Sequence, residues 1–475
     1  MTLPLLLDDA LVSAGHGFAL LVSLPWIRSM PLASVADLTV TIDGDPTSVS
    51  PVIEGRAVQA SQLADSTGWW NIQDRLELRG SRVLRPGAHD VSVSFTLLVP
   101  YLEAGPAGPL ALPFRAERAL IVRDGASSAA PERPSAVTAL RSRPGDNPMH
   151  EVGDAWTLSA SAFNWTPEVV RAERPADEIA VGIVEAGVAR TIEIEAGQVW
   201  RTFPEPSDAE VDRLSDRLAA VGGTVTIVGA SLDDWALPAR RRMDEERLAF
   251  LVPQLRAAAR LGARGVRVPF GQAGPGLLRL VQPVLEDLDV VLFEEIQGQQ
   301  TLDVPANAEN LDLLRGLDDP RIRILIDISM LMPSLPPSYL EALRRGGVAE
   351  ELLQRLEGEW RAPATHGAVI ATLREGRVPP AVRTLFMNLL VRFGRSDVAD
   401  IEQLLPLTAG VHLKFWDLDD TDGRISRPIS HIGAALWRSG FTGTLTSEWG
   451  GHEWLDADPT DATRAHLALA RTALA

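Results

Sequence analysis

The stretch "DEERLAFLVPQLRAAARLGARGVRVPF", residues 244–270, places an amphipathic helical pattern directly before a predicted strand. Apolar residues recur along its first part with helical spacing, and Gly262 stands near the end of that part, where glycine commonly ends a helix. The six residues "GVRVPF" at 265–270 are typical of a buried strand. A helix followed by a strand is the repeating unit of an α/β fold.

The same unit recurs across residues 153–475. A second amphipathic segment, "SDAEVDRLSDRLAAVGG" at 207–223, begins with Ser207 as the predicted N-cap and has Glu210 at the capping-box spacing. Strands are predicted at 157–163, 190–195, 224–230, 265–270, 290–296, 322–327, 410–416 and 443–449. Eight strand–helix units over roughly 320 residues predict a (β/α)8 TIM barrel. The alternative, an open doubly wound sheet, usually has fewer strands and needs a glycine-rich phosphate turn after the first strand, which this sequence lacks.

The regions outside this repeat predict further parts. Residues 1–120 alternate apolar and polar residues in short runs such as "DLTVTIDG", which ends in the turn dipeptide Asp43-Gly44, and they predict an all-β, sandwich-like domain. Residues 121–152 are rich in Ser, Ala, Pro and Gly and predict a flexible linker. Within the barrel, residues 328–409 predict a long helical insertion, which usually builds a lid or an interface.

Composition excludes several classes of function. A net charge of −18 argues against nucleic acid and against an anionic membrane surface as partners. The absence of cysteine excludes disulfides, zinc–thiolate sites and thiol nucleophiles. The apolar run "FALLVSLPW" at 18–26 follows Asp8 and Asp9 rather than basic residues, and it is too short to span a bilayer. We expect a cytoplasmic protein with a small-molecule substrate, and we also expect a homo-oligomer.

Polar residues stand at the ends of predicted strands five to eight, where the active sites of TIM barrels lie. They are Glu294, Glu295, Asp327, His412, Lys414 and Glu448. Three carboxylates at one rim repel one another unless a cation is present. One nitrogen and three oxygen donors suit Mn²⁺, Mg²⁺ or Co²⁺, so a metal site is favoured over an unliganded polar rim. Alternation along the strand lets only one of Glu294 and Glu295 face the barrel axis, and periodicity alone does not decide which.

Lys414 is the only lysine among 45 basic side chains. It is either a surface residue that survived by chance or a compact ammonium that a planar guanidinium cannot replace. Its position two residues after His412, on the same face of a strand, favours the second interpretation.

Half of the twelve tryptophans stand at or just past the ends of predicted strands. They are Trp165, Trp200, Trp235, Trp416, Trp449 and Trp454. They either cap the barrel core or form a flat apolar wall for a sugar or aromatic ring, and we predict the wall.

The strand ends resemble those of the xylose-isomerase-like family of sugar isomerases and epimerases. The matching motifs are "FEEIQG" (293–298), "LIDIS" (325–329), "HLKFW" (412–416) and "SEWGGH" (447–452). In that family a divalent metal is held by Glu, Asp, His and Glu from strands five to eight. The resemblance therefore implies Glu295, Asp327, His412 and Glu448 as ligands, with Mn²⁺ as the foremost metal. The family's first glutamate is followed two positions later by a polar residue, and Gln297 fits that register, which selects Glu295 over Glu294.

A closer resemblance is to the C-glycoside deglycosidases, which have a barrel α subunit and a β-rich small subunit. The stretches "VSLPWIRSMPLASVADLTVTIDG" (22–44) and "GAHDVSVSFTLLVPYLE" (87–103) resemble the β subunit, and the segments around "HLKF" resemble the α subunit. This implies a fusion in the order β then α. It also implies metal-dependent chemistry on a 3-oxo-glycoside, in which abstraction of the C2 proton leads to elimination of the aglycone.

The resemblance also implies roles for individual residues. Glu295 and Glu448 are the candidate bases, and Lys414 would contact a sugar oxygen or the developing oxyanion. Candidate substrate contacts are Arg267, Glu195, Gln297, Trp165, Trp200, Trp416 and Trp449. The family is expected to use a histidine on the aglycone hydroxyls. No motif identifies it here, and His452 and His366 are the candidates.

Three other functions are alternatives to this one. A divalent-metal sugar isomerase or epimerase would share the ligands, but simple epimerases lack the β domain and the insertion. An endonuclease on the same barrel needs several metal-binding histidines and a basic surface, and the sequence has neither. A non-catalytic sugar-binding protein would not need the complete Glu, Asp, His and Glu set.

Overall fold

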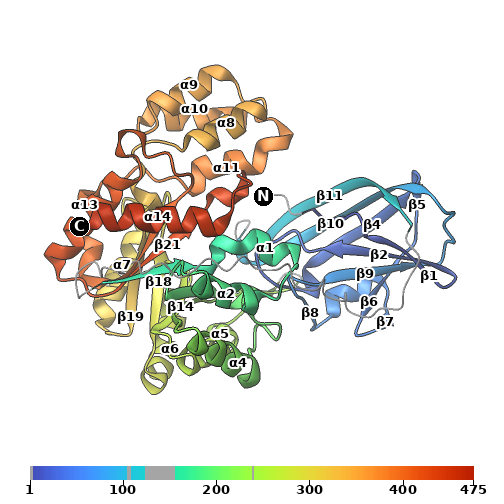
Figure 1. Cartoon of the computed structure of the whole chain (residues 1–475), viewed down its shortest axis with the longest axis horizontal. Helices are drawn as coiled ribbons and strands as arrows, with labels where there is room; N and C mark the ends of the chain where they lie inside the picture. The colour runs from blue at the N-terminus through green and yellow to red at the C-terminus, as the bar shows by residue number, and fades with distance from the viewer. Residues whose placement is uncertain (1–3, 104–107, 123–155, 238–239) are drawn as a thin grey trace. The chain divides into compact units, whose positions relative to one another are not determined.

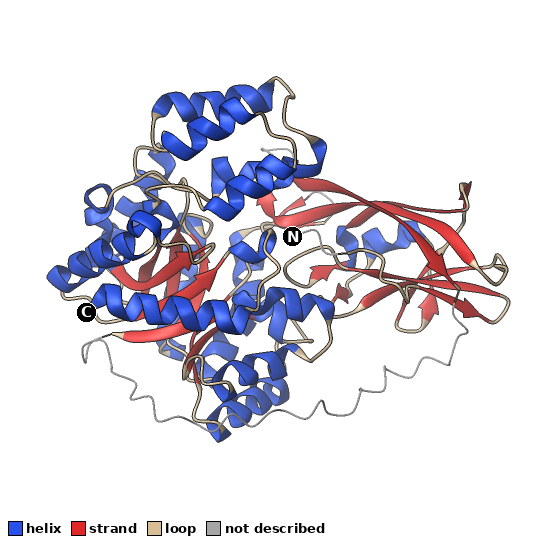
Figure 2. Cartoon of the chain, turned by 45° about the horizontal axis from the view of Figure 1, so that its top comes forward, coloured by secondary structure: helices blue, strands red, loops and turns tan. Residues whose placement is uncertain are grey.

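The computed structural model describes residues 4–103, 108–122, 156–237 and 240–475. The chain divides into two compact units, one mainly Leu3–Glu151 with Trp235–Arg241, the other mainly Val152–Asp234 and Arg242–Ala475. Strands are the main elements of the first unit, whereas in the second unit helices surround the strands (Figure 2). Most of the predicted linker, residues 123–152, lies outside the described residues.

The larger unit contains a closed barrel of parallel strands. In barrel order they are β12 (Thr157–Ser161), β13 (Thr191–Glu195), β14 (Thr224–Gly229), β17 (Gly265–Pro269), β18 (Val291–Ile296), β19 (Ile322–Asp327), β20 (Thr408–Phe415) and β21 (Thr444–Trp449). The closing pair is β12 and β21, which run parallel from Thr157 opposite Thr444. The predicted TIM barrel is confirmed, and each predicted strand ends within two residues of the observed one.

Helices connect the barrel strands and cover the outside of the barrel (Figure 1). They are α1 (Thr166–Arg171), α2 (Ala176–Glu185), α3 (Ala196–Val199), α4 (Asp208–Ala220), α5 (Asp244–Arg260), α6 (Gly274–Leu288), α7 (Pro305–Leu317), α13 (Ser426–Ser439) and α14 (Pro459–Leu474). Helix α4 buries Val211, Leu214 and Leu218, which share one face because they are three and four residues apart.

The ends of two helices test the predicted caps. Helix α5 ends at Arg260, and Gly262 follows with φ +70°, a left-handed conformation that glycine adopts at little cost. Ser207 is the N-cap of α4, as predicted, but the capping box does not form. The Glu210 carboxylate instead accepts hydrogen bonds from the Ser207 hydroxyl and from the backbone N–H of Arg201.

The chain between β19 and β20 is helical. Its elements are η4 (Ile328–Leu331), α8 (Pro337–Arg345), α9 (Glu350–Gly358), α10 (Pro363–Arg374), η5 (Pro380–Val382), α11 (Arg383–Val391), α12 (Val398–Ile401) and η6 (Glu402–Leu407). These helices have an apolar core of their own, which also contains Trp416 from the loop after β20. Gly298, just after β18, approaches this segment so closely that a Cβ there would lie 2.1 Å from the carbonyl oxygen of Val391.

The N-terminal unit is strand-rich, as predicted. One sheet has the order β1 (Leu11–Ala14), β2 (Gly17–Ser23), β9 (Arg75–Gly80), β6 (Ser50–Ile53) and β7 (Arg56–Ala57). A second has the order β11 (Pro109–Ile121), β10 (Ala88–Glu103), β4 (Val35–Ile42) and β5 (Asp45–Pro46). Asp43 and Gly44 both have positive φ and form the predicted tight turn between β4 and β5.

Strand β10 of this unit buries alternate residues. Along β10 the side chains of Val91, Val93, Phe95, Leu97 and Val99 are buried, so one face of the strand forms the core.

Among the helices of the described residues, none is long and apolar enough to cross a membrane.

Candidate metal and catalytic site

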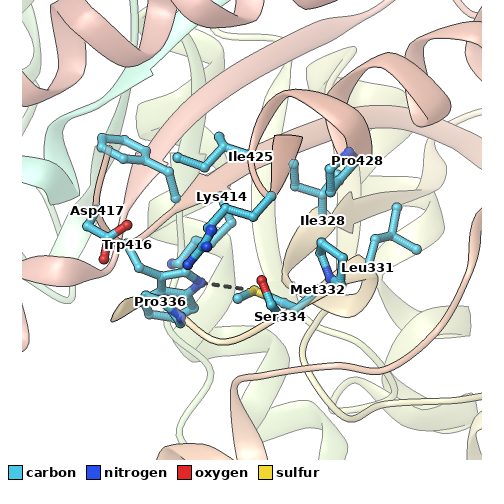
Figure 3. A pocket seen from close by; sticks show the side chains of 13 residues that line it. Ile328, Leu331, Met332, Ser334, Pro336, Lys414, Trp416, Asp417, Ile425 and Pro428 are labelled. Carbon is cyan, nitrogen blue, oxygen red and sulfur yellow. Dashed lines mark hydrogen bonds between the residues drawn. The ribbon is translucent and has the colours of Figure 1, made fainter. Parts of the chain in front are cut away.

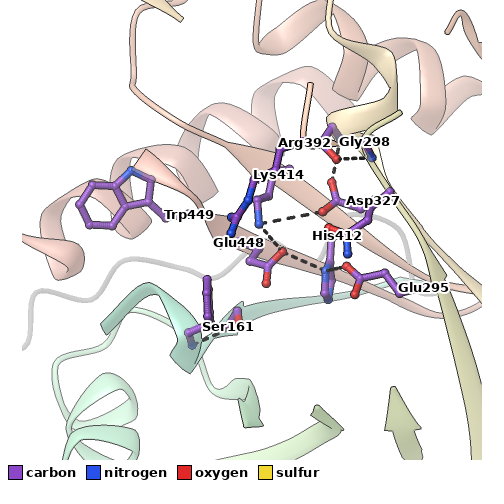
Figure 4. Close-up of polar contacts among 12 residues, drawn as sticks. Ser161, Glu295, Gly298, Asp327, Arg392, His412, Lys414, Glu448 and Trp449 are labelled. Atoms are coloured by element: carbon purple, nitrogen blue, oxygen red, sulfur yellow. Dashed lines mark hydrogen bonds and ion pairs between the residues drawn. The ribbon is translucent and has the colours of Figure 1, made fainter. Parts of the chain in front are cut away.

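Four side chains from four neighbouring strands converge at the C-terminal end of the barrel. Glu295 lies on β18, Asp327 ends β19, His412 lies on β20 and Glu448 lies on β21. One potential ligand atom from each lies within 4.8 Å of the others, and all four residues are buried. Figure 4 shows Glu295, Asp327, His412 and Glu448 pointing toward one another. We call these four residues the acidic cluster.

Alternation along β18 separates the two adjacent glutamates. Glu295 points into the barrel and joins the acidic cluster. Glu294 instead accepts hydrogen bonds from the Asn310 amide (2.6 Å) on α7 and from the backbone N–H of Gly271 (3.2 Å). Burial raises the pKa of Glu294 to about 7. The structure therefore brings only Glu295 to the site.

The His412 imidazole lies at the centre of the cluster. Its Nδ1 atom is 3.0 Å from Glu295 Oε1 and 3.1 Å from Glu448 Oε2. Its Nε2 atom is 3.0 Å and 3.2 Å from the two carboxylate oxygens of Glu193, which lies on β13. Burial alone lowers the pKa of His412, but Glu193, Glu448 and Glu295 outweigh burial and raise it well above its usual value. The position therefore favours positive charge.

The donor atoms of the cluster fit a divalent cation. Asp327 Oδ1 accepts a hydrogen bond from the backbone N–H of Ser329 (2.7 Å), whereas its buried Oδ2 has no hydrogen-bond partner. Burial raises the pKa of Asp327 to about 6. The neighbouring carboxylates of Glu448 and Glu295 also raise it, because a second negative charge nearby disfavours ionisation. A buried oxygen without a partner, beside two more carboxylates and one imidazole nitrogen, is a donor set for a hard or borderline metal ion.

Lys414 supplies a second cation to the site. Its Nζ atom donates to Glu448 Oε2 (2.8 Å), lies 4.0 Å from Asp327 Oδ2, and lies over the Trp416 ring at 5.3 Å from the centroid. Burial lowers the pKa of Lys414, but Glu448 and Asp327 outweigh burial and raise it, so the ammonium stays charged. Burial would likewise raise the pKa of Glu448, but Lys414 and His412 hold it well below its usual value.

Arg267 on β17 binds three carboxylates at once. Its guanidinium donates to Glu193 Oε1 (2.8 Å), to Glu295 Oε2 (2.7 Å) and to Glu195. The hydrogen bonds of Arg267 are thus made to other residues of the protein, and they link the acidic cluster to β13. Burial raises the pKa of Glu195 to about 7. The nearby carboxylates add to this rise, and the attraction of Arg267 opposes it.

Glu193 was not identified from the sequence. It is fully buried and lies inside a strand, whereas the predicted ligands all lie at strand ends. A signal was present nevertheless, because Glu193 and Glu195 alternate in "IEIE" and so must face the same side of β13. Two acidic residues on the inner face of a barrel strand require a buried cation nearby.

The four tryptophans predicted to contact substrate are only 1–3% exposed. Trp449 donates from its indole N–H to the Trp416 carbonyl (2.8 Å), Trp416 contacts Met332 Sδ (3.2 Å), and Trp165 contacts the Thr460 hydroxyl (3.3 Å). Trp200 is 1% exposed. In this structure the four side chains are buried, and of them Trp416 packs in the core of the helical segment after β19 and also lines the pocket beside Lys414.

The remaining predicted residues, His452, Gln297 and His366, are not members of the acidic cluster. His452 is buried, its Nδ1 lies 2.9 Å from the Trp449 carbonyl oxygen, and burial lowers its pKa to about 4, so the imidazole is neutral near pH 7. Gln297 is partly buried, and its backbone N–H donates to Gln300 Oε1 (2.9 Å). His366 lies on α10, in the helical segment after β19.

A pocket adjoins the cluster at Lys414 (Figure 3). Its walls come from η4 and the residues after it, from the end of β20, and from the start of α13. Trp416 and Met332 form one side, where the indole N–H contacts the sulfur. Lys414 lines this mostly apolar pocket and also binds Glu448, so the pocket lies next to the acidic cluster.

Comparison with known proteins relates the chain to two kinds of subunit. No family model matches it. The C-glycoside deglycosidase alpha subunit of Arthrobacter globiformis is 27% identical over 330 residues, which are 68% of this chain and 93% of the relative. The 3'-dehydrocarminate deglycosidase alpha subunit of a Microbacterium species is 24% identical over 315 residues, or 63% and 90%. The corresponding beta subunit from Microbacterium is 32% identical over 103 residues, or 21% and 78%.

Two solved structures of sugar epimerases are among those that the chain resembles. A D-psicose 3-epimerase is 14% identical, with a TM-score of 0.40, over 67% of this chain and 99% of the other. A 3-keto-D-glucoside 4-epimerase from E. coli is 13% identical, with a TM-score of 0.38, over the same two shares.

Proposed function

Because the chain belongs to the family of C-glycoside deglycosidases, with likeness to both an α and a β subunit, we propose that it cleaves 3-oxo-glycosides. The name of one relative, a 3'-dehydrocarminate deglycosidase, describes a glycoside whose sugar is oxidised at the 3' carbon. The observation that carries the proposal is the buried acidic cluster, with Lys414 against Glu448, at the catalytic end of the barrel.

The chemistry follows from the ketone. A carbonyl at C3 acidifies the hydrogen at C2, so a carboxylate can remove that proton and leave an enolate. The enolate electrons then form the C1–C2 double bond, the bond from C1 to the aglycone breaks, and the aglycone keeps the electron pair and takes a proton. One C–H bond and one C–C or C–O bond break without any change in oxidation state, which makes the reaction an elimination and the protein a lyase.

Glu448 and Glu295 are the proposed bases. Both are held ionised by cations: Lys414 and His412 lower the pKa of Glu448, and Arg267 and His412 lower that of Glu295, in each case against the effect of burial. An ionised, buried carboxylate is able to accept the C2 proton. The Lys414 ammonium, 2.8 Å from Glu448, would donate to the oxygen on which negative charge develops.

Glu295, Asp327, His412 and Glu448 would hold a divalent cation, with Mn²⁺ first and Mg²⁺ or Co²⁺ as alternatives. When bound, such an ion supplies a Lewis acid that lowers the energy of negative charge on the sugar oxygens. His452, neutral and adjacent to the site, is the proposed acid/base for the aglycone. We further propose that the protein is cytoplasmic and that it is a homo-oligomer. Light scattering during size exclusion would test the oligomeric state.

The experiment is incubation of the Mn²⁺-loaded protein with 3-oxo C-glucosides, 3-oxo O-glucosides and free ketoses, followed by product analysis. Release of the aglycone with an unsaturated 3-oxo sugar supports the proposal. Interconversion of free ketoses without aglycone release would instead identify an epimerase. Binding without turnover in every arm would identify a sugar-binding protein.

A further inference from the structure

Glu193 contacts the histidine of the acidic cluster from a strand outside that cluster. It lies on β13, 219 positions before His412, and both residues are fully buried. Its two carboxylate oxygens lie 3.0 Å and 3.2 Å from His412 Nε2. Because both side chains are fully buried and in hydrogen-bond distance, the contact is a direct, charge-assisted hydrogen bond.

The two ring nitrogens of His412 face different partners. Nδ1 lies 3.0–3.1 Å from Glu295 and Glu448, the other members of the cluster, and Nε2 faces only Glu193 among the acidic side chains in contact with the ring. A carboxylate can only accept, so Nε2 must carry the hydrogen that points at Glu193. Without an ion, Nδ1 faces the carboxylates of Glu295 and Glu448 in the same way and carries a hydrogen too. A divalent cation between these two carboxylates would displace that hydrogen and bind the Nδ1 lone pair.

Arg267 fixes the position of Glu193. It donates to Glu193 Oε1 (2.8 Å) and to Glu295 Oε2 (2.7 Å). One rigid guanidinium therefore sets the separation between the carboxylate that holds the histidine and a carboxylate of the cluster. Glu195, two residues along β13, also binds Arg267 but has no contact with His412.

We propose that Glu193 is a positioning residue that holds His412 in the Nε2–H form and directs Nδ1 at the bound divalent cation. The inference rests on the proposed function, because it requires that the acidic cluster bind a metal. A carboxylate that accepts from the remote N–H of a metal-bound histidine orients the ring and raises the basicity of the ligating nitrogen. Loss of such a partner costs about 10–100-fold in metal affinity.

The test is titration calorimetry of the full chain with Mn²⁺ and Mg²⁺. Glu193→Ala should weaken binding about 10–100-fold. Glu193→Gln keeps an acceptor oxygen and should weaken it less. The comparison variant is Glu195→Gln, which removes a carboxylate from Arg267 without touching His412 and should weaken binding less than Glu193→Gln does. A ¹⁵N-histidine spectrum of the Mg²⁺-loaded wild type should place the His412 hydrogen on Nε2.

The outcomes separate the two proposals. Wild-type protein that binds neither metal overturns the metal-dependent function and this inference with it. Wild-type binding that both Glu193 variants retain unchanged overturns only the role of Glu193. Equal losses in Glu193→Gln and Glu195→Gln also overturn it, since they would trace the effect to Arg267. If Glu193→Ala does not fold, Glu193→Gln and the spectrum decide.

Discussion

The two sides of the barrel mouth contribute different chemistry to one site. Strands β18 to β21 contribute the acidic cluster and Lys414, which can contact a substrate or a metal. Strands β13 and β17 contribute Glu193, Glu195 and Arg267. Arg267 forms ion pairs with both glutamates and with Glu295 of the cluster. Under the proposed function, the first side would perform the reaction and the second side would hold the reacting groups in position. Variants on each side should therefore fail in different measurements.

The largest effect is expected on the reacting side. Glu448→Gln removes a candidate base and a cluster ligand, and turnover of a 3-oxo-glucoside should fall by at least about 10²–10⁴-fold. Steady-state kinetics would measure this, with circular dichroism to verify the fold. Glu294→Gln is the matched control, since its carboxyl points away from the cluster and its turnover should persist. Wild-type turnover by Glu448→Gln would contradict the assignment.

The supporting side should respond first in stability. Arg267→Met leaves three carboxylates without their shared cation, and breaking a buried ion pair costs about 3–5 kcal/mol of unfolding free energy. Urea denaturation would measure it. Arg344→Met, at an exposed pair with Glu341 and Glu350, should leave the midpoint nearly unchanged. An Arg267 variant as stable as the Arg344 variant would remove the distinction between the two sides.

Lys414 tests whether the reacting side needs a compact ammonium. Lys414→Met should lower kcat about 10²–10³-fold with a smaller change in KM, because the charge acts on the developing oxyanion. Lys414→Arg restores charge but not shape, and it should recover little of the loss. Full activity in Lys414→Arg would show that only charge matters, and full activity in Lys414→Met would remove Lys414 from the mechanism.

The smallest effect belongs to Glu294, which lies behind both sides. Its pKa is raised to about 7 in the folded chain, so the folded state binds a proton that the unfolded state releases above about pH 4.5. Its contribution to stability is therefore complete at low pH and is lost as pH rises through 7, by up to about 3 kcal/mol. Glu294→Gln should remove this fall in unfolding free energy between about pH 4.5 and pH 7. An unchanged pH profile would contradict it.

Only the residues on the first side of the barrel mouth could be predicted well from the sequence. The barrel strands are continuous apolar runs bounded by turns, so their positions follow from the sequence within two residues. The polar residues that end strands five to eight lie at one rim because parallel strands share a direction. The supporting side was less visible, since Arg267 and Glu195 looked like substrate contacts and Glu193 lies inside a strand. Side-chain partners across a barrel depend on three-dimensional register, which a linear pattern does not contain.

The tryptophans show the same limit. Their clustering near strand ends followed from the sequence, but whether an indole faces a ligand or a neighbour depends on packing. Trp416, for instance, joins the core of the helical segment after β19, where Phe393 lies 4.8 Å away between ring centroids. A residue type that suits both a core and a sugar site cannot be assigned from its position along the chain.

The single lysine has a practical consequence. A protease that cleaves only after lysine has one site in the whole chain, and that site lies inside β20, in which every residue is buried. Cutting there requires the barrel itself to open rather than a loop to fray. The rate at which such a protease produces two fragments therefore reports barrel opening alone, and a ligand that binds the folded site would slow it in proportion to its occupancy.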